Sequence, residues 1–356
     1  MKFRKIGVLT SGGDAPGMNA SVRAVVRKAL ENGIEVVGIL GGYSGLINDN
    51  VKELTARDVS NKISQGGTIL YTDRCEEFKT PAGMAKAIAT CKKYEIDAIV
   101  AIGGDGTFRG ATDLTNHGIP TIGVTGTIDN DVSATDYTVG FDTAMNTVIE
   151  MVDRLRDTAE SHARCIVTEV MGRHCGEIAL LTGIASGAVA VAIPEIEFDV
   201  DACMEKIKEL RVAGKRNYQI IVSEGVGGIG SGFSQNLVKT ITERTGIEAR
   251  YICLGHVVRG GVPTLRDRVA ASRMGAKAVD LLLEGKSNLV VCEIDSDIVP
   301  VDINYSFALD KMYKKKLKDG DLDAFSEEQI AEMRAFCARK EAYVRDLYEL
   351  ANALAK

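Results

Sequence analysis

Short apolar runs rich in β-branched residues alternate along this chain with longer segments in which apolar residues recur at helical spacing. The strands predicted from the short runs are residues 6–10, 35–40, 98–104, 120–126, 165–170, 189–195, 218–225 and 251–256. The clearest helical segment follows the GFD sequence, and its predicted buried face is Ala144, Val148, Met151 and Leu155. Strands that alternate with helices are typical of βαβ units, so the pattern predicts an α/β fold with mainly parallel sheets.

Polar and glycine-rich clusters follow most of these predicted strands. They are SGGDAPG (11–17), GGDG (103–106), TGTIDND (125–131), EVMGRHCG (169–176), VSEG (222–225) and GHVVRGG (255–261). A strand-to-helix loop needs glycine and a capping residue, but it does not need repeated Asp, Arg and His. Because ligands of parallel sheets bind beyond the carboxyl ends of the strands, the clusters indicate functional loops.

Composition narrows the class of protein. A length of 356 residues suggests about two domains. A net charge of −6 disfavours a general nucleic-acid binder, which needs a basic surface. The eight cysteines show no paired spacing, which favours a reducing compartment. With neither a signal-peptide pattern nor a long apolar span in the sequence, we expect a cytoplasmic protein without membrane or nucleic-acid partners.

The segment GGDGT (103–107) is typical of a loop that holds phosphate groups. Consecutive glycines allow backbone N–H groups to approach phosphate oxygens, and a following helix adds a favourable dipole. Asp105 does not suit a direct contact with phosphate because like charges repel, but it can hold a Mg²⁺ ion that bridges to the phosphates. SGGDAPG has the same character, so the two loops together predict a bound nucleotide.

The segment GTIDND (126–131) places two carboxylates just after an apolar strand. Transfer of a phosphoryl group to an alcohol needs a base that takes the hydroxyl proton, and Asp129 is our candidate. Asp131 can tune that carboxylate, reach the metal through water or anchor the loop. The alternative is that both aspartates only cap the following turn.

Arginines near the ends of other predicted strands indicate an anionic acceptor. They are Arg164, Arg173, Arg250 and Arg259, with His256 close to the last of them. Arginine binds phosphate through two parallel hydrogen bonds, and clustered arginines without matching acids are otherwise costly. A sugar phosphate fits this set, with Glu224 as an acceptor for its hydroxyl groups.

Taken together, these motifs resemble those of the ATP-dependent 6-phosphofructokinases. The resemblance rests on SGGDAPGMNA, GGDGTFRG, GTIDND, TVGFDTA, EVMGRHCG, GHVVRGG and ASRMGAKAVDLLLEG, and it extends to about residue 305. It implies Mg²⁺-dependent transfer of a phosphoryl group from ATP to the 1-hydroxyl of fructose 6-phosphate in glycolysis. It also implies a homotetramer whose subunits have two Rossmann-like three-layer domains, with the active site in the cleft between them.

The resemblance further implies domain boundaries and roles for single residues. Residues 1–140 with 257–307 are expected to bind ATP and Mg²⁺, and residues 141–256 with 308–356 are expected to bind the sugar phosphate. Asp129 is the expected base, Asp105 the expected metal ligand, and Thr127 and Arg173 are expected to steady the phosphoryl group. Expected contacts with ATP are Gly13, Tyr43, Arg74, Cys75, Gly106 and Thr107. Expected contacts with fructose 6-phosphate are Thr127, Asp129, Asp131, Met171, Gly172, Arg173, Glu224, His256 and Arg259, with Arg164 and Arg250 reaching in from a neighbouring subunit.

Two positions bear on the phosphoryl donor. Pyrophosphate-using relatives carry Asp at the last glycine of GGDG and Lys before the threonine of GTIDND, whereas this chain has Gly106 and Gly126. A hydrogen atom in place of a carboxylate leaves room for an α-phosphate, so ATP is favoured over pyrophosphate. A GGDGT-type kinase for another acceptor, such as NAD, and a catalytically silent nucleotide-binding subunit are the remaining alternatives.

The effector site is where the chain departs from the family. That site lies at a subunit interface and binds ADP or phosphoenolpyruvate through basic residues, which Arg23, Arg27, Arg156 and Lys215 match. Ala56, Asn61, Val189 and Ala213 stand where typical bacterial members carry Arg, Asp, Glu and Lys. Because the loss of charge-assisted contacts weakens anion binding, we expect weak or altered allosteric control.

The sequence ends in a helical segment that Ser326 and Gln329 begin as a capping box. Its apolar stripe is Ile330, Met333, Cys337, Val344, Leu347 and Leu354. Lys340 interrupts this stripe, which favours a helix docked on its own subunit over a coiled coil. The preceding KMYKKKLK (311–318) is interpreted as a solvated basic face.

Overall fold

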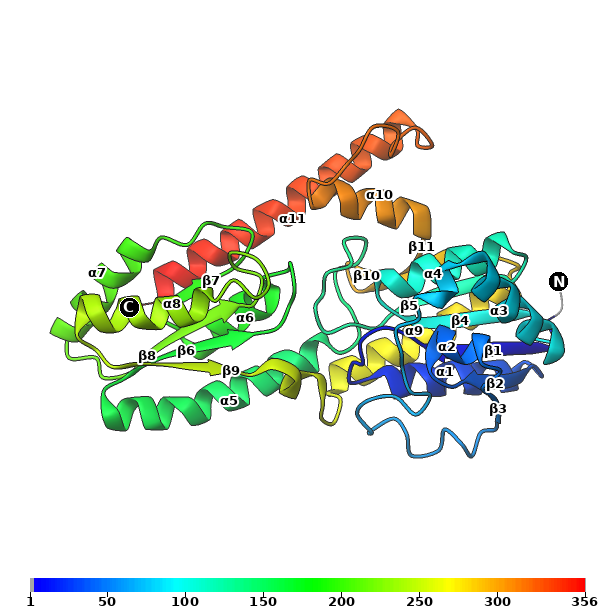
Figure 1. Ribbon diagram of the computed structural model, residues 1–356, viewed down its shortest axis with the longest axis horizontal. Helices are drawn as coiled ribbons and strands as arrows, with labels where there is room; N and C mark the ends of the chain where they lie inside the picture. Colours follow the sequence, from blue (N-terminus) through cyan, green and yellow to red (C-terminus); the bar gives the residue numbers. More distant parts are fainter. Residues whose placement is uncertain (1–2, 356) are drawn as a thin grey trace. The chain divides into compact units, whose positions relative to one another are not determined.

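The computed structural model describes residues 3–355, which form two compact units (Figure 1). Unit 1 contains the described residues up to Ile128 together with Val132–Thr143 and Arg259–Met333. Unit 2 contains Asp129–Asp131, Ala144–Val258 and the described residues from Arg334 onward. This division places residues 308–333 in unit 1, whereas the sequence analysis grouped them with the second domain.

Unit 1 is built on a seven-stranded sheet of order β11-β10-β5-β4-β1-β2-β3. Its strands are β1 (Lys5–Thr10), β2 (Glu35–Ile39), β3 (Val51–Leu54), β4 (Ala98–Gly103), β5 (Thr121–Thr125), β10 (Leu289–Ile294) and β11 (Asp297–Asp302). The inner strands run parallel, and β3 and β11 pair antiparallel at the two edges. Every residue of β4 and β5 is buried, as expected for parallel strands covered on both faces.

Helices cover both faces of this sheet (Figure 1). They are α1 (Met18–Glu31), α2 (Gly42–Ile47), α3 (Pro81–Lys93), α4 (Asp105–Asn116), α9 (Leu265–Leu283) and α10 (Ile303–Tyr313), with a 3₁₀ turn at Glu77–Lys79. The connection from β1 to β2 runs toward one edge of the sheet, and the connection from β4 to β5 runs toward the other. Because both crossovers are right-handed, α1 and α4 lie on opposite faces. Helix α9 packs closely against α1, because a Cβ at Gly275 would lie 2.7 Å from the Ser21 carbonyl oxygen.

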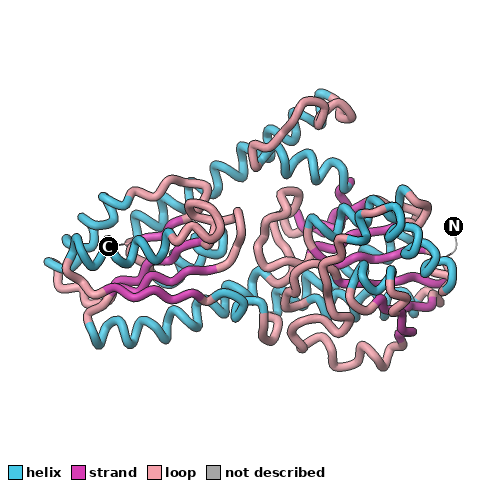
Figure 2. Tube along the Cα trace, in the orientation of Figure 1, coloured by secondary structure: helices cyan, strands magenta, loops and turns pink. Residues whose placement is uncertain are grey.

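Unit 2 has a four-stranded parallel sheet of order β7-β8-β6-β9 (Figure 2). Its strands are β6 (Cys165–Val170), β7 (Ala190–Ala192), β8 (Tyr218–Ser223) and β9 (Ala249–Cys253). The helices are α5 (Phe141–His162), α6 (Glu177–Ser186), α7 (Val200–Val212), α8 (Phe233–Thr245) and α11 (Glu327–Leu354), with a 3₁₀ helix at Gly255–Arg259. Val167, Met204, Ile220 and Ile241 are at the centre of its apolar core.

The predicted α/β fold with mainly parallel sheets is confirmed, with differences in detail. The predicted strand 189–195 is reduced to the three residues of β7, and β3, β10 and β11 were not predicted. On α5 the buried residues include Ala144, Val148, Val152 and Ala159, whereas the predicted Met151 and Leu155 are only partly buried. The predicted stripe was therefore displaced by about one residue toward the edge of the true buried face.

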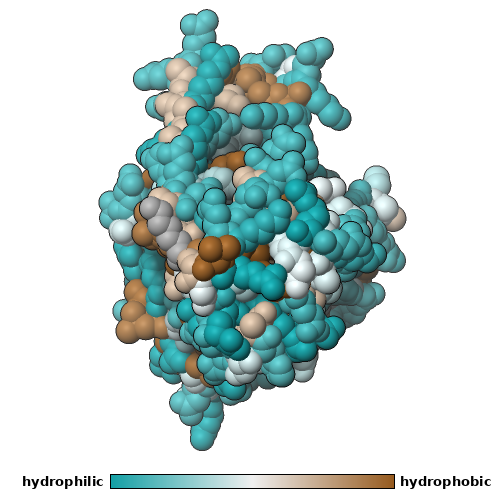
Figure 3. Space-filling view, turned by 90° about the vertical axis from the view of Figure 1, so that its left-hand side faces the viewer, coloured by the Kyte–Doolittle hydropathy of each residue, from teal (hydrophilic) through white to brown (hydrophobic). Residues whose placement is uncertain are grey.

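The helices of the part of the chain that the structure describes were compared with the length and hydropathy that a membrane span requires. Among the described helices, none combines sufficient length with sufficient hydropathy to span a membrane. The face drawn in Figure 3 is hydrophilic over most of its area, with small hydrophobic groups scattered across it.

Candidate active site

The two phosphate-type loops of unit 1 touch each other. β1 and β4 are adjacent and parallel, so the loops that follow them emerge side by side. A Cβ at Gly103 would lie 2.2 Å from Thr107 Oγ1 and 2.4 Å from the Ser11 carbonyl oxygen, so only glycine fits there. The Thr107 hydroxyl donates to that Ser11 oxygen at 2.9 Å. Residues 11–17 and 103–107 therefore form one continuous surface.

Tyr43 supports this surface from below. Its ring is 4% exposed and stacks on Phe78 with the ring centroids 4.2 Å apart. Its hydroxyl donates to the Thr107 carbonyl oxygen at 2.5 Å, and burial raises the pKa of this phenol above its usual value. A Cβ at Gly110 would lie 2.5 Å from the ring, so α4 packs directly on it. The side chains of Tyr43 and Thr107, both expected contacts with ATP, hold the shape of the loop.

Asp105 lies in the first turn of α4, next to open space. A Cβ at Gly106 would have no atom within 4 Å, so the loop surface is unobstructed there. Lys314 Nζ, at the end of α10, lies 3.8 Å from Asp105 Oδ2 and 2.7 Å from Asp310 Oδ1. The interpretation of KMYKKKLK as a solvated face is wrong at Lys314, whose side chain is only 19% exposed because it reaches these two carboxylates.

Arg259 lies against the first loop. Its guanidinium is 3.4 Å from the position a Cβ would take at Gly13, and Arg259 Nη1 is 4.0 Å from Asp14 Oδ1. The Arg259 Nε atom is buried, and no hydrogen-bond partner exists for it among the described residues. A cation with an unused donor beside a glycine-rich loop is suited to an anionic ligand.

The segment that carries Arg74 and Cys75 is attached to the same loop. The Thr72 hydroxyl donates to the Gly12 carbonyl oxygen at 2.8 Å, which ties the start of this segment to SGGDAPG. Arg74 is exposed and Cys75 is partly buried. Both expected ATP contacts therefore lie in unit 1, two and three residues beyond the one that is bonded to the loop.

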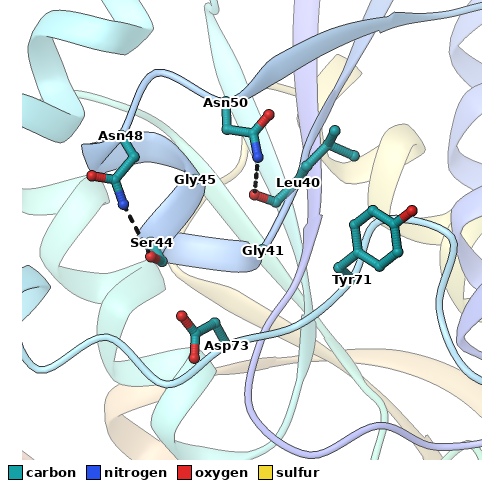
Figure 4. Close-up of a pocket in the computed structure, with 8 residues that line it drawn as sticks. All are labelled: Leu40, Gly41, Ser44, Gly45, Asn48, Asn50, Tyr71 and Asp73. Atoms are coloured by element: carbon teal, nitrogen blue, oxygen red, sulfur yellow. Dashed lines mark hydrogen bonds between the residues drawn. The ribbon is translucent and has the colours of Figure 1, made fainter.

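A shallow depression of about 270 Å³ lies beside α2 (Figure 4). It is lined by Leu40, Gly41, Ser44, Gly45, Asn48, Asn50, Tyr71 and Asp73. Asn50 Nδ2 donates to the Leu40 carbonyl oxygen at 3.3 Å, and Asn48 Nδ2 donates to Ser44 Oγ at 3.2 Å. These bonds close the turn around α2, and none of the expected ATP contacts lines the depression.

The two aspartates of GTIDND belong to unit 2 and lie beside Arg173. Asp129 is 5% exposed. Arg173 Nε is 3.7 Å from Asp129 Oδ2, and Arg173 Nη1 is 4.0 Å from Asp131 Oδ2. The side chain of Arg173 is 51% exposed, so its guanidinium faces solvent as well as the carboxylates. One half-exposed cation thus spans a buried and a nearly buried carboxylate.

The backbone around Arg173 is fixed by its neighbours. Arg173 has a left-handed φ of 53°, and its N–H donates to Glu224 Oε1 at 3.1 Å. A Cβ at Gly225 would lie 2.1 Å from the Arg173 carbonyl oxygen, and one at Gly172 would lie 2.5 Å from the Cys175 carbonyl oxygen. Met171, next in line, is buried at the end of β6. The structure therefore brings together the ends of β6 and β8, as the sequence analysis expected.

Asn130, between the two aspartates, makes a contact that the sequence analysis missed. Its Nδ2 donates to Glu177 Oε2 at 2.7 Å, and Lys340 Nζ lies 3.6 Å from Glu177 Oε1. The signal that pointed to this contact was the lysine interrupting the apolar stripe of the last helix. Its partner was not predictable, because Glu177 and Lys340 are far apart in the sequence.

The predicted substrate residues of unit 2 lie at opposite ends of the strands of its sheet. Met171, Gly172, Arg173 and Glu224 follow the carboxyl ends of β6 and β8, and His256 is exposed on the 3₁₀ helix after β9. Arg164 and Arg250 instead lie at the amino ends of β6 and β9. The distance between the two ends of β6 is roughly 20 Å, because the strand has six residues and rises about 3.3 Å per residue.

Arg164 and Arg250 share an acidic partner, which corrects the premise that these arginines lack matching acids. Arg164 Nε donates to Glu248 Oε2 at 2.7 Å, and Arg250 pairs with the other oxygen of Glu248. The hydrogen bond from Arg164 is the main cause that lowers the pKa of Glu248. Glu248 therefore holds the two arginines close together, through Arg164 Nε and Arg250 Nη2.

The expected effector residues are distributed over both units. In unit 1, Arg23 is partly buried and Arg27 Nη2 donates to the Ala56 carbonyl oxygen at 3.4 Å. In unit 2, Arg156 donates to the Ser186 carbonyl oxygen and Lys215 is partly buried. Val189 is 1% exposed and belongs to the apolar core, so its side chain offers no polar ligand to an effector.

The sequence of this chain matches that of one known protein family. The sequence profile described as Phosphofructokinase matches residues 5–282. A curated relative from Halalkalibacterium halodurans, named ATP-dependent 6-phosphofructokinase, is 52% identical over 301 residues, which cover 85% of this chain and 93% of the relative. A relative of the same name from Clostridium botulinum (strain Loch Maree) is 51% identical over 317 residues, with coverage of 89% and 98%.

Solved structures show the same relationship. A phosphofructokinase structure from Saccharomyces cerevisiae has a TM-score of 0.85 and 32% identity, and the match covers 98% of this chain and 50% of that one. A Pichia pastoris phosphofructokinase has a TM-score of 0.85 and 34% identity, with coverage of 100% and 40%. A pyrophosphate-dependent phosphofructokinase from Marinobacter aquaeolei has a TM-score of 0.74 at 21% identity over 85% of this chain and 83% of that one, which indicates a shared fold.

Proposed function

This chain belongs to the phosphofructokinase family, and from that membership we propose that it transfers the γ-phosphoryl group of ATP to the 1-hydroxyl of fructose 6-phosphate. The products are fructose 1,6-bisphosphate and ADP, and the reaction belongs to glycolysis in the cytoplasm. The observation that carries the proposal is the half-exposed Arg173 beside the carboxylates of Asp129 and Asp131 in a chain 52% identical to a named ATP-dependent 6-phosphofructokinase.

Asp129 accepts the proton of the 1-hydroxyl as the new bond to phosphorus forms. A general base of this kind contributes about 10² to 10⁴ in rate. Arg173 Nε lies 3.7 Å from Asp129 Oδ2. Because it is this near to the base, its guanidinium stabilises charge on the oxygens of the phosphoryl group while that group is being transferred. Glu224 has two tasks, since it accepts the Arg173 N–H and has a second oxygen for a sugar hydroxyl. Met171 and Gly172 shape the wall beside the sugar.

The loop surface of unit 1 binds the nucleotide. The N–H groups of residues 11–17 and 103–107 suit the phosphates, and Thr127 lies close by, 3.9 Å from the position of a Cβ on Gly104. A partly exposed carboxylate beside open space fits Mg²⁺, which prefers oxygen ligands and keeps several of its waters. Asp105 would hold this ion, which when bound would neutralise charge on the β- and γ-phosphates.

The open space at Gly106 supports ATP as the donor. A carboxylate at this position would extend into the region where no protein atom lies within 4 Å of the Cβ, and it would repel an α-phosphate there. With hydrogen at Gly106, the loop admits the larger donor.

Arg164 and Arg250 serve a neighbouring subunit of a homotetramer. One line of support is their place at the amino ends of the strands of unit 2, roughly 20 Å from the carboxyl ends of β6 and β8. The other is that Glu248 holds both side chains in place. A guanidinium pair held in this way presents a cationic patch to a sugar phosphate bound by another copy.

A coupled assay for fructose 1,6-bisphosphate, run with ATP and with pyrophosphate at equal concentrations, tests the proposal. We expect turnover with ATP and Mg²⁺ and little with pyrophosphate. Turnover with pyrophosphate alone, or phosphorylation of NAD without that of the sugar, would replace the proposed donor or acceptor. Absence of any turnover would favour a silent nucleotide-binding subunit.

A further inference from the structure

We propose that Lys340, on the C-terminal helix α11, is a positioning residue that acts through Glu177 and Asn130 on the loop carrying Asp129. Lys340 lies outside residues 5–282, the span that the family profile matches. The inference rests on the proposed function, because it takes Asp129 as the proton acceptor.

The contacts form a short buried chain within unit 2. Lys340 Nζ lies 3.6 Å from Glu177 Oε1, and Asn130 Nδ2 donates to Glu177 Oε2 at 2.7 Å. The side chains of Lys340 and Glu177 are 12% and 7% exposed, and Asn130 is 1% exposed. The Glu177 carboxylate thus contacts α11 through Oε1 and the loop that carries Asp129 through Oε2.

The loop needs this support because of its backbone conformation. Asn130 has a left-handed φ of 50°, which asparagine tolerates better than most residues but which still carries a cost. Its neighbours Asp129 and Asp131 lie beside Arg173, while its own side chain bonds to Glu177. The loop is therefore held by Arg173 through its acids and by Glu177 through its amide. Loss of the second contact would let the backbone at Asn130 relax and move Asp129.

The charge of Lys340 keeps the Glu177 carboxylate in the place where it binds Asn130. A second carboxylate, Glu195, lies in the same buried region, where its Oε1 accepts the Gly176 N–H at 2.8 Å. Burial is the main cause that raises the pKa of Glu195, the negative charge of Glu177 raises it further, and Lys340 opposes the shift. Burial likewise raises the pKa of the Cys175 thiol. Without Lys340, the buried charge of Glu177 would be left without its cationic partner, and the side chain would turn toward solvent and away from Asn130.

The position of Lys340 in α11 fits a specific contact. The buried residues of this helix include Met333, Cys337, Val344 and Ala351, and Lys340 falls on the same face between them. A lysine in the middle of an apolar face is costly unless it is paired. Near its end the helix is attached to α7, since Lys206 Nζ donates to the Asn352 carbonyl oxygen at 3.3 Å. The helix is therefore attached to unit 2 at the ion pair and again near its end.

Substitution of Lys340 tests the inference, with two matched variants. Lys340→Met keeps the aliphatic stem and removes the charge, and we expect about a tenfold fall in kcat with less than a threefold change in the KM for fructose 6-phosphate. Arg345→Met removes a charge from an exposed position of the same helix and should leave both constants unchanged. In the double variant Lys340→Met with Glu177→Gln, a neutral amide oxygen still accepts from Asn130, so kcat should return to within about threefold of the native value.

Hydrogen exchange followed by mass spectrometry adds a readout independent of turnover. Lys340→Met should speed exchange in peptides that cover residues 126–131, and Arg345→Met should not. A Lys340→Met protein with native kcat, native exchange in this loop and only a lower melting temperature would overturn the inference, since Lys340 would then be merely structural. A native protein that does not phosphorylate fructose 6-phosphate would contradict the proposed function instead, and the exchange comparison would still decide the contact.

Discussion

At the scale of single residues, the proposed base is Asp129, a buried carboxylate next to the half-exposed Arg173. Asp129→Asn keeps the shape and removes the basic oxygen, so we expect kcat to fall by about 10² to 10⁴. The KM for fructose 6-phosphate should change little, because other residues are also expected to contact the sugar. Steady-state kinetics measures both constants. Asp157→Asn, at an exposed position on α5, is the control, and equal kcat in the two variants would remove Asp129 from the role of base.

A second residue, Gly106, tests the choice of donor. A Cβ at Gly106 meets no atom within 4 Å, so substitutions there act through charge and not through a clash. We expect Gly106→Asp to lower kcat/KM for ATP by about 100-fold, equivalent to about 2.7 kcal/mol of lost interaction. Gly106→Ala, which adds bulk without charge, should stay within about threefold. Equal losses in the two variants would show that volume, not charge, decides.

At the scale of elements, the start of α5 depends on one buried acid of α9. Asp267 is 0% exposed and accepts hydrogen bonds from the Tyr137 hydroxyl at 2.5 Å, the Gly140 N–H at 2.6 Å, and the Thr143 N–H and hydroxyl at 2.8 and 2.5 Å. Asp267→Ala leaves these donors without their acceptor, and each unsatisfied buried group costs about 1 to 3 kcal/mol.

We therefore expect Asp267→Ala to lower the free energy of unfolding by about 3 kcal/mol, measured by urea titration. Asp280→Ala removes an exposed carboxylate of the same helix, 3.6 Å from Lys28, and should cost less than about 1 kcal/mol. If the two variants were equally stable, the bonds at the start of α5 would not contribute as described.

Element by element, the sequence predicted what short-range patterns encode. The apolar runs of β1, β4 and β6 and the glycine-rich loops after them follow from local chemistry. The edge strand β11 was missed because none of its residues is buried and they include Pro300, which weakens the strand pattern. Arg164 and Arg250 directly precede the predicted strands 165–170 and 251–256, so their amino-end position could be read from the sequence. Their shared Glu248 was missed because the sequence does not show which acid lies beside which base.

At the scale of the whole molecule, the loop that carries the proposed base belongs to the unit that its side chains contact. Asp129–Asp131 fall in unit 2, although the residues on both sides of them belong to unit 1. The contacts that explain this are those of Arg173 with both aspartates and of Glu177 with Asn130. The expected base is thus held by the same unit as Met171 and Glu224, the expected contacts for the sugar.

Regulation is also a property of the whole molecule, and the effector residues predict that it is weak. Ala56 and Ala213 are exposed where cations are typical of bacterial members, and Val189 is part of an apolar core. We expect ADP or phosphoenolpyruvate to change the half-saturating concentration of fructose 6-phosphate by less than about threefold, or about 0.7 kcal/mol. Saturation curves with and without each effector measure this shift.

The same positions provide the matched gain-of-function variant. Ala56→Arg with Ala213→Lys adds two cations at exposed sites without disturbing a packed core. Because charge-assisted hydrogen bonds to an anion contribute about 1.5 to 3 kcal/mol each, the double variant should respond to at least one effector more strongly than the native protein does. A strong response of the native protein itself would mean that Arg23, Arg27, Arg156 and Lys215 suffice for effector binding, and that the missing cations had been replaced by other groups.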